Sequence, residues 1–322
     1  MSIKFYPLVF EPILQDRIWG GTKLKTDLGK NIPTQTTGES WELSAVSGNV
    51  SVVKEGEYAG KPLTYLLEQF PTEVLGTKVH EQFGAQFPLL FKFLDAREDL
   101  SIQVHPNDEL AKQRHNSFGK TEMWYVMQAD PGSRIIVGFK EKSSPEEYLE
   151  KLESKKLIDI LNQVEAKKGD VYFLETGTIH AIGAGIVIAE IQQTSDITYR
   201  IYDWDRVDAN GKGRELHVEQ ALDAMNYNTT DTKKEYNKDE NKSNTMVDCP
   251  YFTTNFLPLN GFTEISKSGN SFTVYICTDG EYSIEADNVT YTFKKGDTVL
   301  IPAGLTAYSL TGTATLLEIY IS

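Results

Sequence analysis

Short segments rich in Val, Ile, Thr, Tyr and Phe recur along almost the whole chain, and this pattern restricts the folds that it can adopt. The segments are bounded by Gly, Asp and Asn, which favour turns. Clear examples are Arg134 to Phe139, Val171 to Leu174, Gly185 to Gln192, Phe272 to Cys277 and Val289 to Phe293. Many short strands separated by turns predict a mostly β protein, built as a sandwich, barrel or jelly roll.

A few helices are expected to interrupt the strands. Apolar residues between Leu63 and Phe70 recur at the spacing of one helix face. Ser144 before Pro145 is typical of a helix start, because Ser can cap free amides and Pro suits the first turn. A third helix is predicted from Val218 to Met225.

The length and a polar segment together predict two domains. The chain has 322 residues, whereas a typical domain has about 100–200 residues. Residues 229–245 are strongly polar and are expected to form a solvated linker or a long loop. We therefore expect an N-terminal catalytic domain with helical insertions over residues 1–228, and a C-terminal domain over residues 246–322.

Two segments resemble each other, which suggests that the two domains share a fold. GDVYFLETGTIHA begins at Gly169 and GDTVLIPAGLTAY begins at Gly296. Ala307 stands where the first segment has His180, and residues 246–322 contain no histidine. The C-terminal domain is thus expected to be a degenerate barrel without a metal site, which covers the first barrel or mediates dimer contacts.

The overall charge of the chain is −14, which argues against nucleic-acid binding because that function needs a basic face. No segment approaches the roughly 20 apolar residues that span a bilayer, and the start lacks the pattern of a secretory signal. Cys249 and Cys277 are too few for a disulfide framework. A cytoplasmic protein is expected, and an anionic substrate would require locally clustered positive charges.

Four side chains could together hold a metal ion. Residues 101–106 alternate in polarity, so Gln103 and His105 are predicted to lie on one face of a strand. Glu122 lies on a second expected strand, and His180 follows a turn that contains glycine. Zn²⁺ accepts such ligands, and so do Mn²⁺, Co²⁺ and Fe²⁺. Each residue taken alone is also explained as structural, since no motif with metal-ligand spacing is present.

Several motifs resemble those of type I mannose-6-phosphate isomerases, a family also called phosphomannose isomerases. The motifs are LSIQVHPND from Leu100, GKTEMWYV from Gly119, GTIHAIGAG from Gly177, FPLLFKFLDA from Phe87, WGG from Trp19, GESWELS from Gly38 and SDITYRIYDWDR from Ser195. The resemblance covers roughly residues 7–227 and implies a cupin fold, the double-stranded β-helix. The chain is similar to the short bacterial branch with two barrels. Longer members carry an extra helical domain and usually a tyrosine at the position of Ile182.

The resemblance also implies a cofactor, a reaction and site residues. It implies one Zn²⁺ per chain, with Mn²⁺ or Co²⁺ as possible substitutes, and the ligands are Gln103, His105, Glu122 and His180. It implies the interconversion of mannose 6-phosphate and fructose 6-phosphate. The catalytic arginine of the family falls on Arg200, its lysine on Lys120, and the carboxylate that acts on the sugar on Glu190.

The residue pattern adds candidate roles and their alternatives. Glu190 lies on a strand face that is otherwise largely apolar, which would raise the pKa of a catalytic base; a surface carboxylate is the alternative. Arg200 could clamp an enediolate oxygen or a phosphate, or it could pair with nearby aspartates. Lys92 and Ser101 are the candidates for phosphate binding. The alternative for Lys92 is a buried ion pair, and the alternative for Ser101 is an ordinary strand hydroxyl.

The chain is therefore expected to be a metal-dependent aldose–ketose isomerase that acts through an enediolate on a small-molecule sugar phosphate. The alternatives are an isomerase of an unphosphorylated sugar, a metal-dependent oxygenase and a non-enzymatic sugar-binding cupin. A monomer and a homodimer are both compatible with the sequence. The residues interpreted as structural are Trp19, Trp41, Glu42, His80, His115 and His217.

Overall fold

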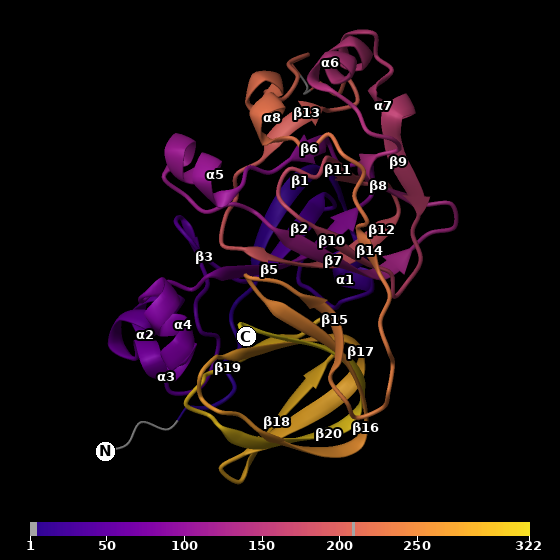
Figure 1. Cartoon of the computed structure of the whole chain (residues 1–322). Helices are drawn as coiled ribbons and strands as arrows, with labels where there is room; N and C mark the ends of the chain where they lie inside the picture. The colour runs from indigo at the N-terminus through magenta and orange to yellow at the C-terminus, as the bar shows by residue number, and fades with distance from the viewer. Residues whose placement is uncertain (1–4, 208–209) are drawn as a thin grey trace.

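The computed structural model describes residues 5–207 and 210–322, and strands form most of its regular structure, as the sequence predicts. Two sheets form an N-terminal half and a third sheet forms a C-terminal half, which lies below it in Figure 1. The helices are α1 (Lys23–Thr26), α2 (Leu63–Gln69), α3 (Pro71–Leu75), α4 (Thr77–Phe83), α5 (Asp108–His115), α6 (Pro145–Glu153), α7 (Leu157–Ile160) and α8 (Val218–Ala224).

The strands pair antiparallel within each sheet. The seven-stranded sheet has the order β1 (Ile13–Gly21), β2 (Thr37–Leu43), β5 (Leu89–Ala96), β12 (Ile186–Gln193), β7 (Glu122–Ala129), β10 (Val171–Leu174) and β14 (Lys233–Lys234). The five-stranded sheet has the order β13 (Tyr199–Tyr202), β6 (Ile102–Val104), β11 (His180–Ile182), β8 (Arg134–Phe139) and β9 (Leu161–Glu165). The sheet of the C-terminal half has the order β15 (Asn244–Asp248), β16 (Thr253–Ser266), β20 (Ala307–Tyr320), β17 (Thr273–Ala286) and β18 (Val289–Lys294), and β19 (Thr298–Ile301) pairs with β17. A small hairpin joins β3 (Ala45–Val46) to β4 (Asn49–Val50).

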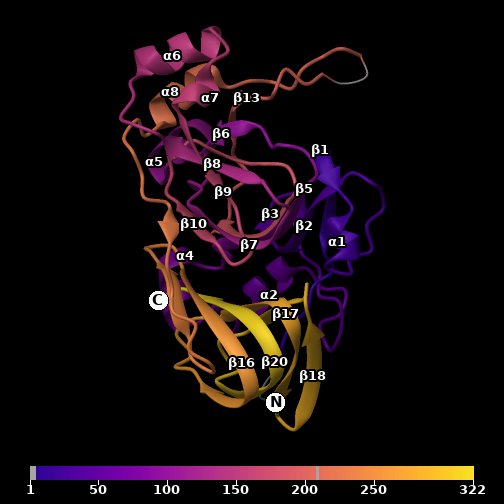
Figure 2. The ribbon, with the colours of Figure 1, turned by 90° about the vertical axis from the view of Figure 1, so that its right-hand side faces the viewer.

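The expected helices form close to their predicted places. Within α2, the side chains of Leu63, Leu66 and Leu67 are buried. At the start of α6, the hydroxyl of Ser144 accepts a hydrogen bond from the amide of Glu147, as a capping residue does. Figure 2 shows that α6, α7 and α8 gather at the end of the N-terminal half that is remote from the C-terminal half.

Strand alternation divides the N-terminal half into two apolar regions. In β5, β7 and β12, every second side chain packs between the seven-stranded and five-stranded sheets, with Leu94, Val126 and Ile188 as examples. The intervening side chains, such as Phe91 and Ala189, belong to a different cluster on the outer face of the seven-stranded sheet. These strands are therefore buried on both faces.

The outer cluster joins the two halves of the molecule. It includes Phe87 and Phe91 of the N-terminal half and Phe252 and Phe272 of the C-terminal half, together with the buried leucines of α2 and α3. Near the N-terminus, Leu8 forms a β-bridge with Leu300, which ties the first described residues to the C-terminal sheet. The halves therefore share one continuous core.

The two similar sequence segments have the same backbone structure. In the first segment, the amide of Gly169 donates to the carbonyl of Val126 at 2.8 Å, and the amide of Val126 donates to the carbonyl of Asp170 at 2.9 Å. In the second segment, the amide of Gly296 donates to the carbonyl of Cys277, and the amide of Cys277 donates to the carbonyl of Asp297, both at 2.9 Å. Each glycine has a positive φ, 89° and 93°, which a side chain would strain. The segments form β10, β11 and β19, β20 respectively, so the internal repeat is visible in the fold.

The polar segment 229–245 is less free than a solvated linker. Its residues Lys233–Lys234 form β14, which extends the seven-stranded sheet at β10. The ring of Tyr236 packs on Phe256 with centroids 5.0 Å apart, and its hydroxyl donates to the carbonyl of Gly169 at 2.7 Å. Backbone pairing and one aromatic residue thus fix a segment whose composition predicts a loop. The division into two domains at this segment stays a prediction.

Among the described residues, no helix is long and apolar enough to cross a membrane. The location of the protein in the cell and its oligomeric state remain predictions.

The shared core predicts that a cavity in the C-terminal half destabilises the N-terminal half. Phe272 is fully buried, and its ring centroid lies 4.8 Å from that of Phe87. We expect Phe272→Ala to lower the free energy of unfolding by about 3–5 kcal/mol. Urea denaturation followed by tryptophan fluorescence measures this, because all 4 tryptophans precede residue 229.

The matched control is Phe262→Ala, since the side chain of Phe262 is 59% exposed. That variant should unfold within about 0.5 kcal/mol of the unsubstituted protein. An unchanged tryptophan transition in Phe272→Ala would mean that the two halves unfold independently.

Candidate metal centre and sugar cavity

Three adjacent strands of the seven-stranded sheet place polar side chains on the face that looks toward the five-stranded sheet. Glu190 on β12 lies opposite Lys92 on β5 and opposite Trp124 on β7. One step further, Gln192 lies opposite Glu122. The parity predicted for Glu190 is confirmed, because its strand neighbours Ala189 and Ile191 belong to the outer cluster.

The five-stranded sheet brings three further candidates into one row. His180, at the start of β11, pairs with Gln103 on β6, and Arg200 on β13 pairs with Gln103 from the other side. His105 follows directly after β6 and is 2% exposed. The two sheets thus face each other with the candidate ligands on both inner faces.

His105, Glu122 and His180 form a cluster that could hold a metal ion, with one ligand atom from each residue within 4.8 Å of the others. His105 Nε2 lies 3.5 Å from Glu122 Oε2, and His180 Nε2 lies 3.4 Å from Glu122 Oε1. Within the described residues, neither His105 Nε2 nor either oxygen of Glu122 has a hydrogen-bond partner, although all three are buried. Buried polar atoms without partners are costly, and a bound cation would satisfy them.

Backbone carbonyls orient both imidazoles. His105 Nδ1 lies 2.9 Å from the carbonyl oxygen of Ile197, and His180 Nδ1 lies 2.8 Å from that of Thr178. Each Nδ1 therefore carries the proton, and each Nε2 presents its lone pair to the cluster, as a metal ligand must. Burial lowers the pKa of His180 to about 4 and that of His105 well below its usual value, so both rings are neutral near pH 7.

Gln103 ends beside the same cluster. Its side-chain nitrogen lies 3.2 Å from His180 Nε2. A half-turn of the amide exchanges nitrogen and oxygen without moving the rest of the side chain, so the oxygen can take that place. The four predicted ligands are therefore brought together, and two imidazoles, a carboxylate and an amide oxygen form a donor set that suits Zn²⁺.

Two lysines and a second carboxylate, Glu190, lie near this cluster, and all three side chains are buried. Lys120 Nζ lies 3.3 Å from Glu122 Oε2, and Lys92 Nζ lies 3.3 Å from Glu190 Oε1. Burial alone would lower the pKa of Lys120, but Glu122, Glu190 and Glu39 raise it above its usual value. Lys120 is therefore a cation in this environment.

The raised pKa expected for Glu190 is wrong. Burial does raise it, but the charges of Lys92 and Lys120 outweigh burial and hold the pKa below its usual value. Trp124 Nε1 adds a hydrogen bond to Glu190 Oε2 at 2.9 Å. The neighbours of Glu190 on β12 are apolar as expected, but Lys92 on the adjacent strand β5 favours the ionised form of the Glu190 carboxylate.

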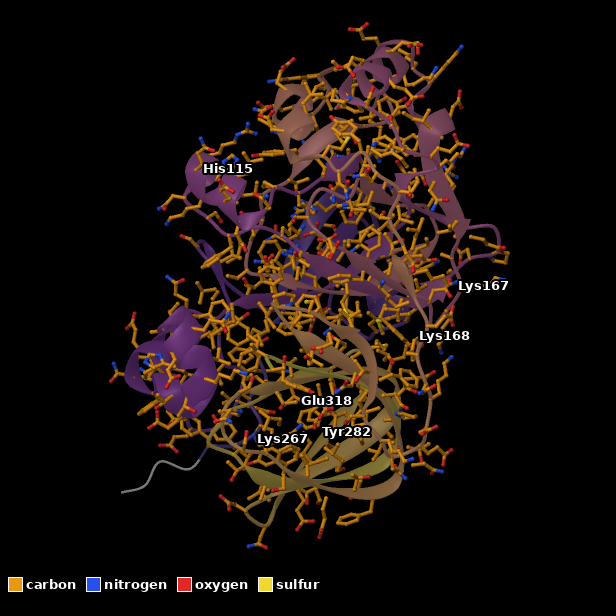
Figure 3. All side chains as sticks on the ribbon, viewed as in Figure 1. His115, Lys167, Lys168, Lys267, Tyr282 and Glu318 are labelled. Atoms are coloured by element: carbon orange, nitrogen blue, oxygen red, sulfur yellow. The ribbon has the colours of Figure 1, made fainter. Side chains whose placement is uncertain are left out.

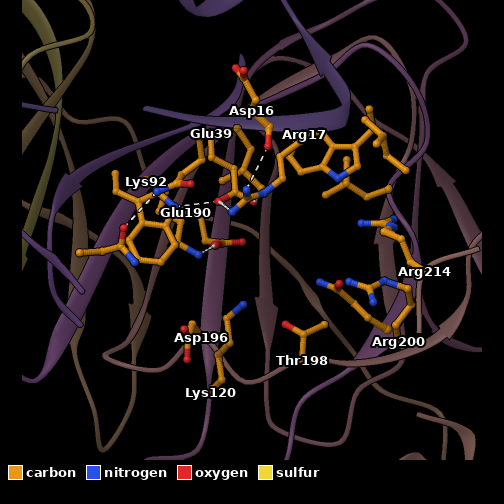
Figure 4. A pocket seen from close by; sticks show the side chains of 18 residues that line it. Asp16, Arg17, Glu39, Lys92, Lys120, Glu190, Asp196, Thr198, Arg200 and Arg214 are labelled. Atoms are coloured by element: carbon orange, nitrogen blue, oxygen red, sulfur yellow. Dashed lines mark hydrogen bonds and ion pairs between the residues drawn. The ribbon is translucent and has the colours of Figure 1, made fainter. Parts of the chain in front are cut away.

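Lys92, Lys120 and Glu190 line a cavity of about 580 Å³. Figure 4 shows Lys92, Glu190 and Glu39 on one side and Arg200 and Arg214 on the other. The other described residues that line it are Gln15, Asp16, Arg17, Ile18, Trp19, Trp41, Asn49, Leu94, Leu100, Gln103, Lys120, Asp196 and Thr198.

Arg200 and Arg214 form a positively charged wall. Arg214 donates to both oxygens of Asp203 at 2.5 and 2.8 Å, which fixes its guanidinium group. Arg200 donates to the carbonyl of Glu215 at 2.9 Å, while its buried Nε has no partner among the described residues. Burial and the nearby charge of Arg214 lower the pKa of Arg200. Two guanidinium groups that repel each other at a cavity wall favour an anion between them.

Some lining residues have roles that the sequence pattern does not indicate. Trp41 is buried, as a packing residue is expected to be, and it also lines the cavity, where Lys92 Nζ lies 4.7 Å from the centre of its ring. Arg17 binds both oxygens of Glu39, each at 3.0 Å, and Glu39 also accepts from Trp41 at 2.7 Å. No local signal marks Arg17, since its role depends on pairing between β1 and β2.

Other candidates lie away from the cavity. Ser101 is buried, and it is not among the described residues that line the cavity. Ile182 packs in the core between the two sheets. His217 accepts a hydrogen bond from the amide of Arg200 at 3.2 Å. His115 lies on α5, labelled in Figure 3, and contacts the hydroxyl of Tyr199 at 2.8 Å, so both histidines keep their structural interpretation.

Comparisons with known proteins agree with this site. Two family models match the chain, "Phosphomannose isomerase type I, catalytic domain" over residues 8–131 and "Mannose-6-phosphate isomerase, cupin domain" over residues 242–321. The chain is 38% identical over 312 residues to the mannose-6-phosphate isomerase ManA of Bacillus subtilis, covering 96% of each protein. It is 36% identical over 308 residues to a mannose-6-phosphate isomerase of Streptococcus mutans, covering 95% of each.

Solved structures show the same fold. A crystal structure of the mannose 6-phosphate isomerase from Bacillus subtilis superposes with a TM-score of 0.90 at 35% identity, covering 97% of this chain and 99% of that one. A putative mannosephosphate isomerase from Archaeoglobus fulgidus has a TM-score of 0.80 at 22% identity, which supports the fold alone. The cupin fold expected from the motifs is confirmed, and the chain belongs to the type I phosphomannose isomerase family.

Proposed function

We propose that this chain is a metal-dependent isomerase that interconverts mannose 6-phosphate and fructose 6-phosphate. The observation that carries the proposal is the convergence of the buried ligand atoms of His105, Glu122 and His180 beside a cavity with an ionised carboxylate and two arginines. The names of relatives that match almost the full length of the chain support the same reaction.

The proposed cofactor is one Zn²⁺, held by Gln103, His105, Glu122 and His180, with Mn²⁺ or Co²⁺ as substitutes. A divalent cation bound there would stabilise the negative charge that develops on the substrate oxygens during isomerisation. The neutral imidazoles of His105 and His180 are in the protonation state that metal binding requires. Burial raises the pKa of Glu122 to about 7, and a bound cation would favour its ionised form.

Glu190 is the proposed base that moves a proton between C1 and C2 of the sugar. Its lowered pKa keeps the carboxylate ionised and able to accept a proton near pH 7. Lys92 and Trp124 hold one oxygen each, so the carboxylate enters the reaction already oriented. Lys120, which lines the cavity as a buried cation, would face the negative charge that appears on the substrate.

The proposed phosphate site is the opposite wall of the cavity. Lys92 and Ser101 stay predictions as phosphate ligands: Lys92 lines the cavity but pairs with Glu190 and the ring of Trp41, and Ser101 lies outside the lining. Arg200 and Arg214 offer donors with the planar geometry that suits phosphate oxygens. A sugar bound with its phosphate there would extend C1 and C2 toward the metal centre and Glu190.

Removal of the metal is expected to abolish turnover. Protein treated with a chelator should not convert mannose 6-phosphate, and activity should return with one equivalent of Zn²⁺ per chain. A coupled assay for fructose 6-phosphate, with elemental analysis of bound metal, measures both quantities. Full activity in metal-free protein would contradict the proposal, and zinc-loaded protein that converts only unphosphorylated sugars would change the substrate class.

Loss of the proposed base should act on the chemical step. Glu190→Gln is expected to reduce kcat by roughly 10²- to 10⁴-fold, the usual contribution of a general base. Bound zinc, measured by elemental analysis, should stay unchanged because Glu190 is not a ligand. Asp196→Asn is the comparator, since Asp196 is another of the carboxylates that line the cavity. A larger loss in that variant, with near-normal turnover of Glu190→Gln, would assign the proton transfer to Asp196.

Loss of the proposed phosphate contact should act on substrate binding. Arg214→Ala is expected to raise KM for mannose 6-phosphate by roughly 10- to 100-fold, because a hydrogen bond to a charged group contributes about 1.5–3 kcal/mol. Activity on unphosphorylated mannose should change little. Arg97→Ala is the matched control, since Arg97 pairs with Glu98 outside this cavity. An equal loss on both sugars would argue against a phosphate contact.

A further inference from the structure

The two chain segments that carry His105 and Glu122 lie against each other just outside the metal centre. Lys120 donates its amide to the carbonyl of Pro106 at 3.3 Å. Gly119 approaches so closely that a Cβ on it would lie 2.7 Å from the amide nitrogen of Asp108. Only glycine permits this contact, so the spacing of the two segments is fixed by close packing of the backbone.

The carboxylate of Asp108 fastens this contact. Its Oδ1 accepts from the amide of Gly119 at 2.7 Å and from the side chain of Gln193 at 3.0 Å. The side-chain oxygen of Gln193 accepts a hydrogen bond from the backbone amide of Thr121 at 2.8 Å. The backbone amide of Gln193 donates to the carbonyl of Thr121 at 3.1 Å. The residues on both sides of Lys120 are therefore held by one carboxylate and one amide.

The remaining oxygen of Asp108 is bound by the C-terminal half. The hydroxyl of Tyr251 donates to Asp108 Oδ2 at 2.7 Å. Tyr251 lies in the turn between β15 and β16, far along the chain from the metal centre. Burial, the hydrogen bond with Asp108 and its charge raise the pKa of Tyr251 to about 12, so the hydroxyl remains a donor near neutral pH.

We infer that Tyr251 and Asp108 are positioning residues through which the C-terminal half sets the affinity of the metal centre. The inference rests on the proposed metal site. Tyr251 holds Asp108, Asp108 holds Gly119 and Gln193, and these two place Glu122 opposite His105. A ligand displaced by loss of this support would bind the cation less tightly without any change in the ligands themselves.

The test measures zinc affinity by competition with a chromophoric chelator and, separately, the melting temperature of the metal-free protein. We expect Tyr251→Phe to weaken zinc binding by about 3- to 10-fold, less than the 10- to 100-fold typical of residues that contact a ligand directly. Asp108→Asn should weaken it by roughly 10-fold or more. Because the residues act in series, the double variant should lose little more than Asp108→Asn alone.

Tyr236→Phe is the matched control. Its hydroxyl also donates at 2.7 Å to the N-terminal half, but it donates to the carbonyl of Gly169 and not to Asp108. It should retain the zinc affinity of the unsubstituted protein, and both tyrosine variants should melt at similar temperatures without metal. Unchanged affinity in Tyr251→Phe, or an equal loss in Tyr236→Phe, would overturn the inference.

The affinity measurement requires no substrate, so it separates the inference from the proposed reaction. Unsubstituted protein that binds zinc but does not convert mannose 6-phosphate would refute the proposed reaction and leave the comparison of variants valid. Unsubstituted protein that binds no divalent metal would overturn both.

Discussion

The pairing of β12 with β5 and β7 is the constraint on which the rest of the structure depends. Side chains alternate along each strand, so one register places Lys92, Glu190 and Glu122 on the inner face. It also places Phe91, Ala189 and Met123 in the core that joins the two halves. A slip of one residue would put charges into that core and aromatic rings into the cavity. The stability of the molecule and the geometry of its site are therefore set by the same hydrogen bonds.

The cost of burying charge is met by groups that compensate one another. Lys92 and Glu190, Lys120 and Glu122, and Arg17 and Glu39 form three pairs along the cavity and the metal centre. A buried ion pair by itself is weak support for stability, because both partners lose their hydration. Here the pairs with Lys92 and Arg17 hold the pKa values of Glu190 and Glu39 below their usual range, whereas burial raises the pKa of Glu122 to about 7. A divalent cation added to this balanced set would make the cavity positive, which suits an anionic sugar in a protein whose net charge is −14.

The two halves use one repeated structural unit for different purposes. In the N-terminal half the unit ends at His180, on the wall of the metal centre, whereas Ala307 takes that place in the C-terminal half. The interior of the C-terminal half instead contains Glu318, labelled in Figure 3, which pairs with Lys267 at 2.6 Å and accepts from Ser243 at the same distance. This network satisfies the buried carboxylate with protein donors, whereas Glu122 Oε1 has no hydrogen-bond partner within the described residues and Oε2 has only the ion pair with Lys120 at 3.3 Å.

The sequence by itself determined the strand-rich fold, the main helices, the inward parity of Glu190 and the motifs that contain the four proposed ligands. These features depend on periodicity and on short stretches of neighbouring residues, which can be followed along the chain. Only the tertiary structure decided that Glu190 is an ionised partner of Lys92, that Arg17 and Arg214 line the cavity, and that Tyr251 reaches Asp108. The electrostatic environment of a side chain is a sum over groups that folding brings close, and sequence separation does not indicate which groups those are.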